Sequence, residues 1–67
     1  MRLELDALGM IPATWPNTFY RVETWNTGSR VADFTTPGEA ARFAIADARE
    51  RGCRYDHKVC SMTLNVR

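Results

Sequence analysis

The feature that most constrains the fold of this chain is residues 36–52, TPGEAARFAIADARERG, because this segment carries signals for both ends of one helix. Thr36 and Glu39 form a Thr-x-x-Glu capping box, and the proline after Thr36 occupies the first helical position, where a missing N–H costs nothing. Gly52 suits the left-handed conformation that commonly ends a helix. The segment therefore predicts a helix over residues 37–51. Its expected inner face is apolar and rich in alanine: Ala40, Ala41, Ala44, Ile45 and Ala48.

Strand-like patterns lie on both sides of this helix. Residues 1–7 and residues 58–66 alternate between apolar and polar side chains, which is typical of strands with one buried face. Residues 19–34 predict a hairpin, in which Gly28 supplies the positive φ that the turn needs. The apolar connection at residues 8–18 contains two prolines, which exclude a helix or a central strand there.

This order of elements predicts one small α+β domain over residues 1–67, with the order β-β-β-α-β. We expect an antiparallel or mixed four-stranded sheet with the single helix on one face. A chain of 67 residues builds only one small core, so a stability of a few kcal/mol is expected. The second face of the sheet is then exposed to solvent, covered by residues 8–18, or buried against a partner.

The length of the hairpin loop decides which side chains share a face. A two-residue loop mixes apolar and charged side chains on the buried face, so a three-residue loop is favoured. That loop places Glu23 opposite Asp33. It groups four apolar side chains on the core side: Tyr20, Val22, Ala32 and Phe34.

The charge of the chain narrows the classes of partner. The formal net charge is +1, which argues against a strongly basic nucleic-acid module, although eight of the nine basic residues are Arg. The first residues show no signal peptide, and no apolar run is long enough to span a bilayer. We therefore expect a soluble, cytoplasmic protein with no membrane partner.

Two cysteines, an aspartate and the single histidine lie close together near the C-terminal strand: Cys53, Asp56, His57 and Cys60. Zinc needs four converging ligands, and this spacing matches no common zinc motif, so reduced cysteines are favoured over a metal site or a disulfide. His57 lacks the surrounding residues that orient a catalytic base. We expect no catalytic residue, no metal and no cofactor, and hence no enzymatic activity.

The outer face of the hairpin is the strongest candidate for a binding surface. Trp25 falls there among charged side chains, and exposed aromatic and Arg residues dominate protein interfaces. The alternative is that residues 8–18 fold over Trp25 and cover it. The residues predicted to contact a protein partner are Arg21, Glu23, Trp25, Arg30 and Asp33, helped by Trp15.

A second candidate surface is a basic strip on the outer side of the helix and at its end. Nucleic acid is the alternative partner for this strip, through the residues Arg42, Arg49, Arg51 and Arg54. Acidic residues are interleaved with them, and Asp47 and Arg51 have the i,i+4 spacing of a favourable ion pair. The other interpretation of the strip is therefore an internally paired, solvated helix face.

Part of the chain resembles the arm-type DNA-binding domains of phage integrases. The resemblance spans residues 20–46 and consists of a Tyr-Arg-Val start, the turn glycine at position 28, and the run FTTPGEAARF. It implies a sheet that reads the major groove of DNA. The face that would meet the DNA carries Glu23 and Asp33, and two carboxylates are expected to repel phosphates.

The whole chain is similar in size and style to small proteins of phages and mobile elements, including anti-CRISPR proteins. This resemblance implies a non-catalytic inhibitor that occludes a surface of a host protein or ribonucleoprotein complex. A homodimer, formed through the uncovered sheet face or through a strand edge, is compatible with either function and would enlarge the small core.

Overall fold

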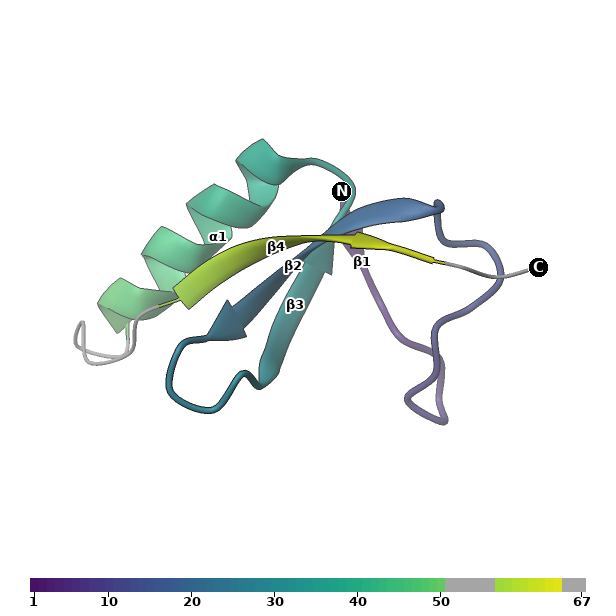
Figure 1. The fold of residues 1–67 in the computed structure, drawn as a ribbon, viewed down its shortest axis with the longest axis horizontal. Coiled ribbons are helices and arrows are strands. Elements are labelled where there is room, and N and C mark those ends of the chain that lie inside the picture. Colours follow the sequence, from purple (N-terminus) through teal and green to yellow (C-terminus); the bar gives the residue numbers. More distant parts are fainter. Residues whose placement is uncertain (51–56, 65–67) are drawn as a thin grey trace.

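The computed structural model of the chain describes residues 1–50 and 57–64. The elements follow in the order β1 (Arg2–Leu3), β2 (Thr18–Thr24), β3 (Arg30–Phe34), α1 (Pro37–Glu50) and β4 (His57–Thr63) (Figure 1). All strand pairs are antiparallel. The α+β prediction and its β-β-β-α-β order are therefore confirmed, with an antiparallel sheet.

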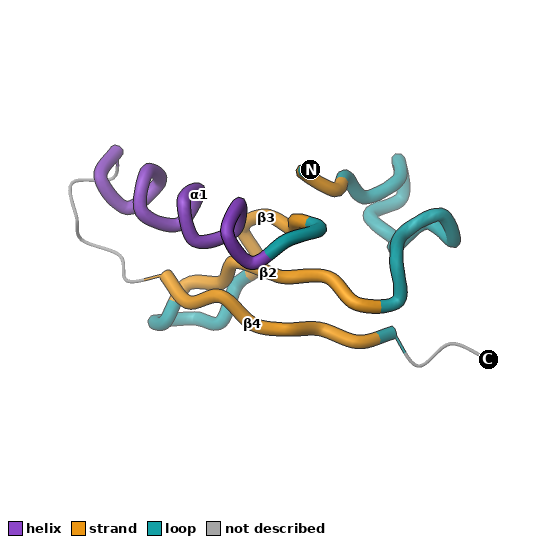
Figure 2. Tube along the Cα trace, turned by 90° about the horizontal axis from the view of Figure 1, so that it is seen from above, coloured by secondary structure: helices purple, strands orange, loops and turns teal. Residues whose placement is uncertain are grey.

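The four strands lie in the order β1-β3-β2-β4, so β2 is central and β1 and β4 are the edges. Figure 2 shows α1 running along one side of the strands, with the connection between β1 and β2 at the far end of the sheet. The helix packs against β2, β3 and β4. Neither edge of the sheet is covered by another described strand.

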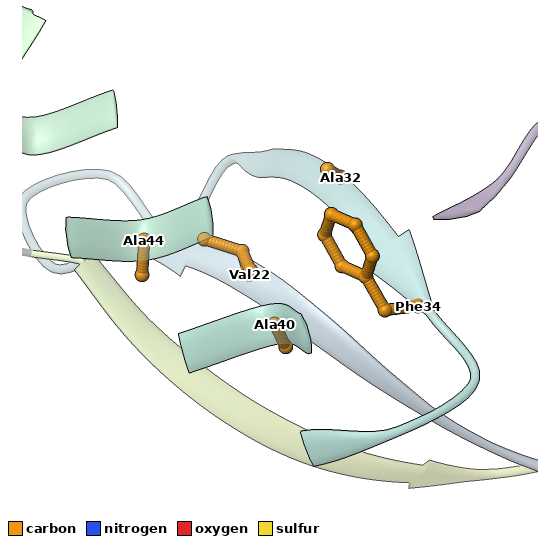
Figure 3. Close-up of a cluster of buried hydrophobic side chains, with 5 residues drawn as sticks. All are labelled: Val22, Ala32, Phe34, Ala40 and Ala44. Carbon is orange, nitrogen blue, oxygen red and sulfur yellow. The ribbon is translucent and has the colours of Figure 1, made fainter. Parts of the chain in front are cut away.

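The core under the helix is built from small side chains. It comprises Val22, Ala32, Phe34, Ala40 and Ala44 (Figure 3). The alanines of α1 allow the helix backbone to lie close to the sheet, and the ring of Phe43 packs 5.3 Å, centroid to centroid, from that of Phe34. Tyr20 pairs with Phe34 and Val22 with Ala32, which confirms the apolar face predicted for the hairpin.

A second core lies on the face of the sheet away from the helix. Its buried members are Leu3, Trp15 and Phe19, with Leu5, Met62 and Leu64 packed around them. The indole of Trp15 meets the ring of Phe19 edge to face, with 5.1 Å between centroids. The connection before β2 therefore covers part of the second face, while its Leu8 and Met10 remain exposed.

The first strand is shorter than the predicted residues 1–7. The carboxylate Oδ1 of Asp6 accepts hydrogen bonds from the backbone N–H groups of Leu8 and Met10, at 2.9 and 2.8 Å. Gly9 adopts a φ of 77° in the same turn. Aspartate side chains commonly stabilise turns by bonding nearby backbone N–H groups, and this turn replaces strand pairing here. As a result β1 ends at Leu3.

The ends of the other elements lie within one residue of the predicted positions where they are described, except that β4 ends at Thr63 and leaves out Leu64, which the prediction included. The Thr36 hydroxyl accepts from the backbone N–H of Glu39, which is one half of the predicted capping box. The Glu39 carboxylate accepts from the same hydroxyl rather than from the Thr36 backbone N–H. Residue 51, the predicted last residue of the helix, lies outside the described residues. So do residues 65 and 66, which the prediction included in the last strand.

The inner face of α1 is rotated from the predicted one. Ala40 and Ala44 are buried as expected, but Ile45 is 57% exposed. Phe43 and Asp47 face the sheet instead. The cause is tertiary, because Phe43 packs against Phe34 of β3 while Asp47 contacts β4.

Candidate functional site: the outer face of the hairpin

The predicted binding residues of the hairpin do share the face of the sheet opposite α1, but their pairing differs from the prediction. Arg21 lies opposite Asp33, and Glu23 lies opposite Arg30. The expected pairing of Glu23 with Asp33 is therefore wrong. Asp33 pairs two residues earlier on β2 than predicted, which leaves its face unchanged, while Glu23 pairs three residues earlier on β3. The register is set by a longer connection than the three residues predicted, with an irregularity between Val22 and Glu23.

The turn of the hairpin is held by its own backbone and hydroxyl groups. Gly28 donates its N–H to the Thr24 carbonyl at 2.8 Å and adopts a φ of 69°. Thr24 donates its N–H to the Ser29 carbonyl at 3.1 Å. The hydroxyl of Thr27 contacts those of Thr24 and Ser29. These bonds give the hairpin a defined end, beside which Trp25 projects.

Asp33 anchors two arginines at the centre of this face. Its side chain is 0% exposed, and each carboxylate oxygen accepts one hydrogen bond. The Nε of Arg21 donates to Oδ1 at 2.8 Å, and the Nε of Arg30 donates to Oδ2 at 2.6 Å. Arg21 also lies over the ring of Phe19, 5.4 Å from its centroid. The buried carboxylate thus holds two guanidinium groups in place from below.

Trp25 lies at the end of the same face, and its side chain is exposed. The residue is 60% exposed, so the connection at residues 8–18 does not cover it. The ammonium Nζ of Lys58 lies 4.8 Å from the indole centroid, in a cation–π contact. Glu23 fixes this lysine, with 3.7 Å between Nζ and the Glu23 Oε1. The Cys60 thiol donates to the same oxygen at 3.6 Å.

Trp15 does not belong to this surface. It is 8% exposed, and its indole Nε1 donates to the backbone carbonyl of Glu4 at 3.1 Å. The prediction that Trp15 helps to form the contact surface is thereby corrected. A buried tryptophan whose N–H has a hydrogen-bond acceptor is a core residue. Here it covers Phe19 on the face of the sheet opposite α1.

The electrostatics of the face also differ from the sequence expectation. Asp33 is buried between two guanidinium groups, and Glu23 is mostly buried and paired with Lys58. The carboxylates expected to repel an anionic partner are therefore neutralised within the sheet. Arg30 and Lys58 have the most exposed side chains of the ion pairs on this face.

The second predicted surface, the basic strip of the helix, is described only in part. Arg42 and Arg49 are exposed and lie two turns apart on α1. Arg51 and Arg54 lie outside the described residues, and so does the predicted pair of Asp47 with Arg51. Among the described residues Asp47 contacts β4, with 2.8 Å between its Oδ2 and the Nε2 of His57.

The cysteine and histidine cluster of the sequence is not assembled in the described part of the chain. Cys53 and Asp56 fall outside the described residues. His57 faces the helix and Asp47, while Cys60 lies on the opposite face beside Glu23. No group of three or more metal-ligating side chains is found among residues 1–50 and 57–64. Within the same residues, no helix has the length and apolar character needed to cross a membrane.

Lys58 is the member of the surface that sequence reasoning missed. The alternation of the last strand places it on the same side as Cys60 and Met62. That side reaches Trp25 only because β4 pairs with β2 rather than with an edge strand, and the register sets Lys58 opposite Glu23. A knowledge of the strand order would have been needed to find it.

Comparisons with protein-family models, with curated proteins and with solved structures gave no match.

Proposed function

We propose that this chain is a non-catalytic protein-binding domain whose contact surface is the outer face of the hairpin. The observation that carries the proposal is the exposure of Trp25 beside a fixed cation. An exposed tryptophan is costly to leave in water, and Trp and Arg are the residues most enriched at the energetic centres of protein interfaces. We define this surface, the Trp25 surface, by five residues: Arg21, Glu23, Trp25, Arg30 and Lys58.

The fixed side chains of the Trp25 surface support the proposal. Arg21 and Arg30 are held by the buried carboxylate of Asp33, and Lys58 is held between Glu23 and the indole. Side chains ordered before binding lose less conformational entropy when a partner arrives. The surface therefore combines a large apolar ring with cations whose positions are already restricted.

The outward charges indicate the chemistry of the partner. The guanidinium and ammonium groups lie nearer to solvent than the carboxylates that pair with them. A partner with carboxylates at matching positions would be steered toward this face and oriented on it. We therefore propose a protein partner with an acidic surface around an apolar contact for Trp25.

The finer proposal follows the resemblance to phage and mobile-element proteins. On that proposal the domain is an inhibitor that occludes a surface of a host protein or ribonucleoprotein complex in the cytoplasm. Binding alone is sufficient for such inhibition, so no catalytic group is required of the domain. The Trp25 surface would then supply the contact that blocks the host complex.

The experiment is a pull-down from bacterial lysate with the tagged chain, its Trp25→Ala variant and a matched Leu8→Ala control. Leu8 is also a large exposed apolar residue, but it lies in the connection between β1 and β2. We expect a stoichiometric protein partner that survives nuclease treatment and Leu8→Ala. Trp25→Ala should weaken its binding at least about 30-fold, as removal of a hot-spot tryptophan does.

Two results would contradict the proposal. If Trp25→Ala and Leu8→Ala retain the partner equally well, the Trp25 surface is not the contact. If the captured material disappears with nuclease, and an Arg42→Gln/Arg49→Gln variant no longer captures it, the nucleic-acid alternative on the helix is supported. That alternative also predicts binding that falls steeply with salt, because phosphate contacts release counterions.

A further inference from the structure

The two edges of the sheet are protected very differently. β1 is an edge of only two residues, Arg2–Leu3. β4 is an edge of seven residues, His57–Thr63, and its register against β2 runs without interruption. It contains no proline and no bulge, and Lys58, its one charged residue of the kind that discourages edge pairing, is paired with Glu23. Long, regular edge strands readily pair with another strand.

The hydrogen bonds at the ends of β2 show which backbone groups of β4 point outward. Leu64 donates its N–H to the carbonyl of Asn17 at 2.7 Å, so this pair is a hydrogen-bonded one. Such pairs alternate along an antiparallel ladder. The next pairs of this kind are Met62 with Phe19 and Cys60 with Arg21.

The residues between them direct their N–H and C=O groups to the open edge, because they form the other class of pair. These residues are His57, Val59, Ser61 and Thr63. The opposite end of β2 agrees, since Thr24, which faces His57, gives its N–H to Ser29 on the side of β3. Val59, Ser61 and Thr63 thus present a regular row of donors and acceptors along an edge that no other described strand covers.

Exposed apolar side chains accompany this row on the helix side of the sheet. Val59 is 38% exposed, and Ile45 of α1 is 57% exposed. Phe43 packs over β3, and Ile45 lies about 200° further round the helix, on the flank toward β4. Backbone groups and apolar side chains are therefore available together along one border of the domain.

We propose that β4 pairs antiparallel with β4 of a second copy of this chain, about a two-fold axis at Cys60. Cys60 is the middle residue of His57–Thr63, so this register overlaps the whole strand. It sets Val59 opposite Ser61 and His57 opposite Thr63 of the second copy, and all four have outward backbone groups. The two sheets become one continuous sheet.

A second copy fits this edge because the pairing satisfies both charge and packing. Lys58 lies opposite Met62 of the second copy, so no like charges meet, and its charge is already paired with Glu23. The two-fold axis is perpendicular to the sheet, which places both helices on the same side. The Ile45 flanks of the two helices then face each other above the two copies of Val59.

The test begins with the mass of the chain in solution, measured by sedimentation velocity over a range of concentrations. We expect a concentration-dependent species of twice the 7.6 kDa chain mass. Val59→Lys and Ile45→Lys should each raise the dimer dissociation constant at least about tenfold, because each places a charge at the proposed interface between the two copies. Ala46→Lys, on the exposed outer side of α1, should leave it unchanged.

Oxidative cross-linking tests the register and does not depend on the lysine variants. In a Cys53→Ser background the single thiol is Cys60. Across the axis Cys60 faces its own copy in a non-hydrogen-bonded pair, where Cβ atoms lie about 4.5–5.5 Å apart. We expect rapid disulfide formation, and much slower formation when Cys60 is replaced by Ser and Thr63 by Cys.

Three results would overturn the proposal. A chain that stays monomeric at about 1 mM has no such dimer. A dimer that Ala46→Lys weakens as much as Val59→Lys uses a different surface. Cross-linking that is as fast through residue 63 as through Cys60 rules out an axis at Cys60. Retention of the circular dichroism spectrum by each variant shows that loss of the dimer is not loss of the fold.

Discussion

Arg21 and Asp33 lie opposite each other on β2 and β3, and the Nε of Arg21 donates to the Oδ1 of Asp33 at 2.8 Å. The carboxylate has no exposed surface, and Arg30 satisfies its second oxygen. Burial of a charge is costly even when it is paired, so this arrangement is a poor way to gain stability. Its effect is to hold two guanidinium groups in fixed positions beside Trp25.

Replacing Asp33 with Asn tests the structural part of this arrangement. The variant loses the charged acceptor while it keeps the shape, and we expect the free energy of unfolding to fall by about 1–3 kcal/mol. Urea denaturation measures the change. Glu4→Gln is the matched control, because Glu4 is an exposed carboxylate whose Oε2 lies 3.4 Å from the Nε of Arg2. An Asp33→Asn variant as stable as this control would show that the buried ion pairs contribute nothing.

Truncation of the two tryptophans should destabilise the domain by very different amounts. Trp15→Ala removes a buried ring that contacts Phe19, at an expected cost of about 3–5 kcal/mol, which is comparable to the total stability of so small a domain. Trp25→Ala should cost less than about 1 kcal/mol, the range of an exposed cation–π contact. Thermal unfolding followed by circular dichroism compares the two.

Fluorescence gives a second measurement on the same pair of residues. In a Trp25→Phe variant the remaining emission comes from Trp15 alone. We expect that emission to be shifted to the blue and to resist quenching by acrylamide, because the indole is buried. Emission that quenches as readily as free tryptophan would place Trp15 at the surface and contradict the second core.

The contact between Asp47 and His57 joins α1 to β4. The His57 side chain is almost fully buried, and its Nε2 lies 2.8 Å from the Asp47 Oδ2. Asp47→Ala should lower the free energy of unfolding by about 1 kcal/mol, because a buried imidazole loses a polar partner. Glu50→Ala, an exposed change one turn later, should have little effect. Equal effects of the two variants would mean that the contact does not contribute to packing of the helix.

The acid stability of the domain should depend on Glu39. Its pKa is held below the ordinary value, chiefly by the hydrogen bond from the N-terminal ammonium and next by that from the Thr36 hydroxyl. A carboxyl with a lowered folded pKa stabilises the fold above its unfolded pKa of about 4.3. This contribution is lost as the pH falls through the folded pKa.

The comparison with Glu39→Gln measures that contribution. The wild-type chain should be more stable than the variant at pH 7, and the difference should shrink progressively below about pH 4. Glu50→Gln serves as the control, since a glutamate near the negative end of the helix dipole gives no stabilisation that acid would remove. A difference between wild type and Glu39→Gln that stays constant from pH 7 to pH 2 would contradict the assignment.

Local signals were sufficient to predict the elements of this fold. The capping box at Thr36 and Glu39 predicted the start of α1, and it depends only on residues three apart. The alternation in the hairpin predicted that Val22 and Ala32 share the core face. A period of two survives an error of two residues in the register, so the faces were correct from Tyr20 to Val22 and from Ala32 to Phe34 although the pairs were not.

The candidate site was harder to predict because it depends on contacts between distant segments. Trp15 is buried because the chain before β2 folds back over Phe19, and no local pattern reports that. Asp33 is buried because β1 and β2 flank β3. Its carboxylate therefore accepts a hydrogen bond from Arg21 rather than from water. Trp25 is exposed because the connection between β1 and β2 does not reach the hairpin turn and leaves the indole uncovered.

The position of β2 at the centre of the sheet has a consequence for how the chain is made. Its neighbour β3 follows it at once, but its other neighbour, β4, is synthesised only after the whole of α1. Until His57–Thr63 has left the ribosome, the nascent chain carries a hairpin whose inner strand has an open edge. Long-range pairing of this kind is slow, and an unpaired edge is prone to join other chains. Completion of this domain therefore has to wait for its last strand, and the hairpin is most prone to aggregation before that strand emerges.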